Sequence, residues 1–125
     1  MIQTLPFVAL GGALGASARY CVNVVALRLL GTGFPYATLG VNILGSFLMG
    51  AVVVTFANKD LTRYAPFVMT GVLGGFTTFS AFSLDAVSLW ERGETLAATG
   101  YVAGSVILSL AALLAGMALT RAILA

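Results

Sequence analysis

Three stretches of this chain contain no charged residue, and each is long enough to cross a lipid bilayer. They are bounded by Arg28 and Lys59, by Arg63 and Asp85, and by Glu94 and Arg121. A helix that spans the hydrocarbon core needs ~20 predominantly apolar residues. Residues 5–27 form a fourth apolar stretch, which only Arg19 interrupts. The chain therefore has the sequence pattern of four membrane-spanning helices.

We place these helices near residues 4–28, 34–57, 63–90 and 96–123. Short turns rich in glycine and polar residues join them, at residues 31–33, 58–60 and 91–94. Of the 125 residues, 60% are hydrophobic and 8% are charged, which is too little polar surface for a soluble domain. We expect a single all-α domain over residues 1–125. It would be a multi-pass protein of an inner cell membrane, with lipid as its surroundings.

The composition also excludes several kinds of chemistry. The chain has no histidine and a single cysteine, Cys21. No intrachain disulfide, zinc site or iron–sulfur site can be assembled from these residues. No nucleophile–base pair containing histidine exists either. We therefore expect neither an enzyme nor a nucleic-acid-binding protein.

Positive charge is almost balanced between the two ends of the expected helices. Lys59, Arg63 and Arg121 lie on the side of the N-terminus, and Arg28 and Arg92 lie on the other. An excess of Lys and Arg normally marks the cytoplasmic side. Near balance favours insertion in both orientations, which would supply the subunits of an antiparallel homodimer. The alternative is that lipids, or one more arginine within the first span, bias insertion to one orientation.

Residues 70–83 place glycines and five hydroxyl side chains inside an apolar span, in the sequence TGVLGGFTTFSAFS. Non-helical backbone is tolerated at membrane depth only where protein buries it or where it lines a cavity. We expect the third helix to unwind within residues 74–78, chiefly because of the Gly74-Gly75 pair. A polar function is expected at this break.

Two ionisable residues lie within the spans. Arg19 either attracts anions at the mouth of a pathway or extends its side chain to the lipid headgroups. Asp85 follows the expected break, and we expect it to pair with an arginine of its own chain or of a neighbouring chain.

The remaining polar and aromatic candidates each have two interpretations. Asn42 could form an interhelical hydrogen bond or donate to an anion. Other side chains recur at helical spacing, where packing or bonding within one helix is the simpler interpretation. These are Phe79 with Phe82, Ser80 with Ser83, and Ser105 with Ser109.

Three motifs together resemble the Fluc, or CrcB, family of fluoride channels. They are GGALGASARY at residues 11–20, YATLGVNILGS at residues 36–46 and GVLGGFTTFSAFS at residues 71–83. The resemblance covers essentially the whole chain. It implies an antiparallel homodimer with two fluoride pores and a structural Na⁺ ion at the dimer interface.

The resemblance also implies roles for individual residues. The backbone carbonyls of Gly74 and Thr77 would bind Na⁺, and Arg19 would lie in the vestibule. The pore would be lined by Asn42, Phe79 and Phe82, with a hydroxyl track that includes Ser105 and Ser109. Ser80 and Ser83 are further candidates for the pore lining. The chain departs from the commoner form of the motif at Ala81, which has no hydroxyl.

Two other transport functions fit the same length and span number. A fluoride/proton antiporter would need an ionisable coupling residue in its pathway, and Asp85 is the only candidate. A small dual-topology drug/proton antiporter would need a titratable group, usually glutamate, in the middle of the membrane. The first span has none.

Overall fold

The computed structural model describes residues 2–125, and this part of the chain is helical apart from short connections. Four of its helices are long and apolar enough to cross a membrane, which confirms the four expected spans. They run over Ile2–Leu30, Tyr36–Lys59, Pro66–Glu91 and Thr95–Leu124. The third begins at Pro66 and not at residue 63, because a separate short turn precedes it.

The first span consists of a 3₁₀ turn, η1 (Ile2–Thr4), followed by α1 (Leu5–Leu30). The second is α2 (Tyr36–Lys59), and the fourth is α5 (Thr95–Leu124). The 3₁₀ turn η2 (Thr62–Tyr64) leads into the third span. That span has three parts: a π-helical segment η3 (Pro66–Leu73), the short helix α3 (Gly74–Phe76) and α4 (Phe79–Glu91).

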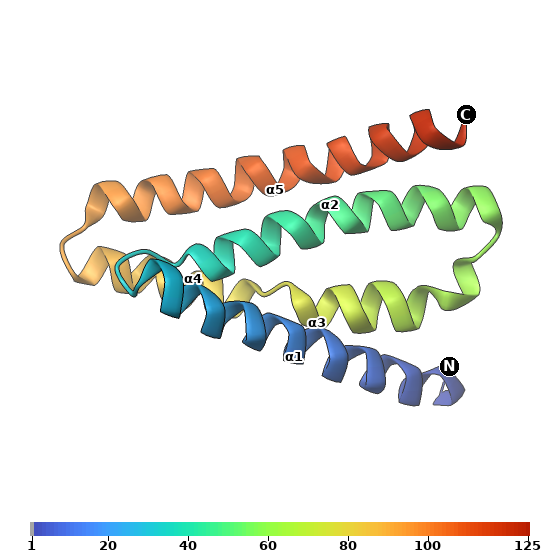
Figure 1. Cartoon of the computed structure of the whole chain (residues 1–125), viewed down its shortest axis with the longest axis horizontal. Coiled ribbons are helices and arrows are strands. Elements are labelled where there is room, and N and C mark those ends of the chain that lie inside the picture. Colours follow the sequence, from blue (N-terminus) through green and yellow to red (C-terminus); the bar gives the residue numbers. More distant parts are fainter. Residues whose placement is uncertain (1) are drawn as a thin grey trace.

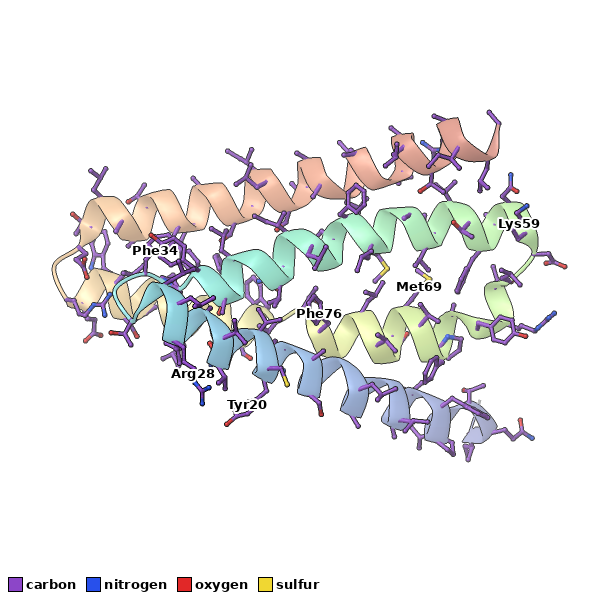
Figure 2. All side chains as sticks on the ribbon, in the orientation of Figure 1. Tyr20, Arg28, Phe34, Lys59, Met69 and Phe76 are labelled. Carbon is purple, nitrogen blue, oxygen red and sulfur yellow. The ribbon has the colours of Figure 1, made fainter. Side chains whose placement is uncertain are left out.

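The four spans run alternately up and down (Figure 1). Helix α2 packs mainly against α5, while α1 packs along η3 and α3. Both termini lie at the same end as the connection between α2 and η3 (Figure 1). Arg28 and Lys59 lie toward opposite ends of the bundle, as four spans require (Figure 2).

The expected turns are present and have the backbone conformations that their residues favour. Gly31 and Gly93 have φ of 79° and 82°, where a side chain would be strained. Asp60 ends α2 in the left-handed conformation, with φ of 56°. Asp is one of the few residues with a side chain that tolerates this region. Local sequence therefore determines where these helices end.

Most large apolar side chains of α1 and α5 are exposed, because the four helices enclose only a small core (Figure 2). The largest fully buried side chains are Val41, Leu89 and Tyr101. Such apolar outer faces suit contact with lipid or with another protein chain. Close packing occurs instead along glycines, because a Cβ on Gly15 would collide with the Val72 carbonyl oxygen. Van der Waals contact of this kind holds helices together in lipid.

Candidate functional site

The third span is broken at two residues, Thr77 and Thr78. Thr77 has φ −86° and ψ 159°, and Thr78 has φ −152° and ψ 127°, so both are extended. Gly74 is helical, with φ −63° and ψ −35°. The prediction that the Gly74-Gly75 pair unwinds was therefore wrong, although the break lies within the expected residues 74–78. Gly75 serves close packing instead, because a Cβ there would lie 2.7 Å from the Gly12 carbonyl oxygen.

The threonine hydroxyls replace part of the hydrogen bonding that the break removes. The Leu73 carbonyl accepts hydrogen bonds from the Thr77 N–H and from the Thr77 hydroxyl, both at 3.0 Å. The Thr78 hydroxyl accepts from the Ala81 N–H at 3.2 Å and so caps the start of α4. The two threonines therefore end one helix and begin the next.

Asn42, on the neighbouring helix α2, binds the backbone at the break. Its Oδ1 accepts a hydrogen bond from the Thr78 N–H at 2.8 Å, and its Nδ2 donates to the Thr78 carbonyl at 3.0 Å. Both backbone groups of Thr78 are paired in this way. Nδ2 carries two hydrogens, and one of them remains for another acceptor.

Arg19 on α1 approaches the break from the other side. Its Nε donates to the Gly75 carbonyl at 3.0 Å. The side chain also lines a cavity of about 220 Å³ together with Thr78, Ala81 and Asp85. Arg19 therefore lies at the end of the half-helix that precedes the break.

A groove of about 510 Å³ runs past the break between α2, α4 and α5. It collects most of the residues that the sequence analysis selected for a pore and an ion site, although these come from three spans. They are Asn42, Gly74, Thr77, Phe79, Phe82, Ser105 and Ser109. Ser80 and Ser83 are not among the groove-lining residues. Ser83 donates instead to the Phe79 carbonyl, at 3.0 Å, and is partly buried.

Aromatic rings lie along one side of this groove. The ring centroids of Phe79 and Phe82 are 5.6 Å apart, with the rings tilted by 48°. Phe82 also packs on Tyr101, at 5.3 Å. Phe79 is 78% exposed, so its ring stands at the edge of the groove with little support from its own chain.

Tyr101 is a site residue that the sequence analysis missed. Its hydroxyl donates to Asp85 Oδ2 at 3.2 Å. Within the described residues a tyrosine on α5, and not an arginine of the same chain, provides this donor, while pairing with an arginine of a neighbouring chain stays a prediction. The spacing of Tyr101, Ser105 and Ser109 is one helical turn per step, so extending the Ser105–Ser109 row backwards would have found it.

Ser105 supplies an unused hydrogen-bond donor to the groove. The residue is 5% exposed. Within residues 2–125 its hydroxyl has no hydrogen-bond partner. A buried polar group without a partner costs ~1–3 kcal/mol. A ligand that accepts a hydrogen bond in this groove would remove that cost.

The break also leaves carbonyl oxygens that suit a hard cation. Among the described residues, no donor hydrogen-bonds to the backbone carbonyls of Gly74 and Thr77, and both residues line the groove. No cluster of three or more His, Cys, Asp or Glu side chains occurs in the same part of the chain. Backbone carbonyls without donors are thus among the oxygen atoms that this site offers to a metal ion.

The chain matches the family model described as "CrcB-like protein, Camphor Resistance (CrcB)" over residues 6–117. Its relatives include a protein of Cereibacter sphaeroides named "Fluoride-specific ion channel FluC", 64% identical over 97% of both chains. A protein of the same name from Ruegeria is 62% identical over 99% of both chains. Another, from Paracoccus denitrificans, is 55% identical over the full length of both.

Proposed function

This chain belongs to the CrcB family, and we propose on that basis that it is a passive, fluoride-selective ion channel. The observation that carries the proposal is the groove that the buried Ser105, with its unpartnered hydroxyl, lines together with Asn42 and Phe82. The relatives, which are named as fluoride-specific ion channels, support transport across a membrane and not catalysis. The four spans make the chain a multi-pass membrane protein. We place it in the inner membrane of the cell.

The donors in the groove suit a small, strongly hydrated anion. A selective pore must replace the water around fluoride with closely spaced donors. Asn42 provides an amide N–H, Ser105 and Ser109 provide hydroxyls, and the phenylalanine rings present positive edges. No lysine or arginine lines the groove, so no fixed cation would trap the ion there.

A proton-coupled mechanism finds less support in this geometry. Asp85 is the one acidic residue within the third span before its final turn. Its carboxylate lines the cavity beside Arg19, is absent from the groove-lining residues and accepts the Tyr101 hydrogen bond. Fluoride/proton antiport and drug/proton antiport both need a titratable group in the pathway. Passive conduction needs none.

The groove requires a further wall before it can act as a closed pore, and a second copy of the chain in antiparallel orientation is our proposed partner. Phe79 is 78% exposed beside the groove, and the exposed apolar faces of α1 and α5 offer area for contact. The balanced positive charge supplies subunits in both orientations. A two-fold axis in the membrane plane would then create two equivalent pores.

We further propose a structural Na⁺ ion at the axis of this dimer. The carbonyls of Gly74 and Thr77 are hard oxygen ligands at the C-terminal, negative end of a half-helix. Each subunit would contribute two of them, making four ligands around the ion. The cation would join the two breaks without being transported.

The membrane potential provides a direction for the flux. Hydrogen fluoride enters cells as a neutral molecule from acidic surroundings and ionises at the pH of the cytoplasm. A passive channel lets the negative-inside potential expel the anion, with ~2.3 kcal/mol per charge per 100 mV. Export of cytoplasmic fluoride therefore needs no coupled energy source.

Purified protein in liposomes tests the proposed activity. Liposomes loaded with fluoride should release it rapidly once a potassium ionophore removes the charge imbalance, as measured with a fluoride electrode. Liposomes loaded with chloride should release it at nearly the rate of protein-free liposomes. Equal rates for the two ions would contradict fluoride selectivity.

Antiparallel assembly predicts a specific labelling pattern. A Lys59→Cys substitution in a Cys21→Ser background places one thiol at the exposed C-terminal end of α2. Because subunits in both orientations are needed, a membrane-impermeant thiol reagent should label about half of the thiols from each side. Labelling from one side alone, in a preparation that conducts fluoride, would overturn the antiparallel dimer and the sodium site that depends on it.

A further inference from the structure

Gly11, Gly15 and Arg19 form a row on α1, each one turn after the last, and this row follows the first half of the broken span. A Cβ on Gly11 would lie 2.9 Å from the Gly71 Cα, and one on Gly15 would lie 2.8 Å from the Phe76 N. The backbones of α1 and of η3 and α3 are therefore almost in contact. Arg19 continues the row to the point where α3 ends.

The carbonyl that Arg19 contacts has lost its helical partner. In a continuous α-helix the Gly75 carbonyl would accept a hydrogen bond from the Phe79 N–H. The extended Thr77 and Thr78 place Phe79 at the start of another helix. The Gly75 carbonyl belongs instead to the last turn of α3, where carbonyls lack helical donors and carry partial negative charge. The Arg19 Nε–H supplies a charged donor there, 3.0 Å from the oxygen.

We propose that Arg19 is a positioning residue that holds the end of α3 through its Nε–H and so fixes the geometry of the break. This inference deepens the proposed channel function. Of its two tests, only the flux measurement depends on that function. Arg19 and Asn42 then secure the two sides of the break, with one bound to Gly75 and the other to Thr78. In the sequence, Thr77 lies between the two anchored residues, and Gly74 comes directly before the first of them.

Positioning and anion attraction make different demands on the side chain. Attraction of anions needs a positive charge near the cavity. Positioning needs a donor at the location of Nε, three bonds beyond Cβ. Glutamine carries its amide nitrogen at the same number of bonds and is neutral. Lysine keeps the charge but carries its nitrogen one bond further out, and leucine has neither property.

The three substitutions therefore rank differently under the two roles. Positioning predicts that Arg19→Gln retains most of the maximal fluoride efflux at saturating fluoride. It predicts that the maximal fluoride efflux of Arg19→Lys and Arg19→Leu falls about ten-fold or more. Arg28→Leu is the matched control, because Arg28 is exposed on the same helix and makes no described contact with the break. It should conduct as the unchanged protein does.

Hydrogen exchange provides a readout that does not depend on transport. The amides of Thr77 and Thr78 should exchange about ten-fold faster in Arg19→Leu, and close to the original rate in Arg19→Gln and Arg28→Leu. The proposal would be overturned if Arg19→Lys kept full fluoride efflux while the efflux of Arg19→Gln was as low as that of Arg19→Leu. It would also be overturned if the Thr77 and Thr78 amides exchanged at equal rates in all variants. If Arg19→Leu fails to fold, the comparison of Arg19→Gln with Arg19→Lys still distinguishes positioning from anion attraction. If the unchanged protein conducts no fluoride, the exchange rates still test positioning while the channel function fails.

Discussion

Replacing Asn42 with leucine is expected to reduce fluoride efflux about hundred-fold or more. The substitution keeps a similar volume but removes the two hydrogen bonds to Thr78. Each backbone group left unpaired away from water costs ~1–3 kcal/mol, and the break would rearrange to recover partners. The groove would also lose its amide donor. Both effects act on the same pathway, which is why the expected loss is large.

The measurement is the initial rate of fluoride efflux from liposomes that contain equal amounts of folded protein. Asn58→Leu is the matched control, because it makes the same chemical change at the exposed end of α2, far from the break. Circular dichroism and size-exclusion chromatography should show that both variants remain helical and of one size. Normal efflux in Asn42→Leu would show that the Thr78 hydrogen bonds do not shape the pathway.

Replacing Phe79 or Phe82 with isoleucine is expected to lower fluoride efflux about ten-fold or more in each case. Isoleucine keeps the apolar character of the site and removes the positive ring edge that can face an anion. The two rings lie 5.6 Å apart beside the groove. In the proposed channel, removing the ring at either position would interrupt a row of weak donors along the groove.

The Phe79→Ile substitution is the clearer test of the two, because it changes less of the packing within the chain. Phe82 packs on Tyr101, so its replacement also removes contacts that stabilise the fold. Phe79 is 78% exposed, and its loss costs little packing within the chain. Phe7→Ile, on the exposed face of α1, controls for the same change elsewhere in the membrane. If both groove variants conducted normally, the rings would serve packing alone.

The spans and turns could be predicted from the sequence because lipid permits few alternatives. Charge-free stretches of sufficient length must form helices that satisfy their own backbone groups. Gly31 and Gly93 mark helix ends by their positive φ, which the sequence indicates locally. Polar residues inside the apolar spans, together with the family resemblance, then selected residues such as Asn42 and Ser105, which the structure brings into one groove.

The details of the break could not be predicted because they depend on contacts between distant segments. Arg19 contacts a residue 56 positions away, and Asn42 contacts one 36 positions away. A tandem glycine pair indicates either unwinding or close approach, and only the position of α1 shows that Gly75 serves close approach. The donor to Asp85 depends in the same way on how α4 packs against α5.

The central claim is that fluoride crosses this protein passively and without another ion. The most direct test holds proteoliposomes with a fixed fluoride gradient at a series of membrane potentials and finds the potential at which net fluoride flux is zero. A passive, selective channel predicts that this potential equals the fluoride equilibrium potential and stays there when a chloride gradient or a proton gradient is added. A shift with the chloride gradient would contradict selectivity, and a shift with the proton gradient would show coupled antiport.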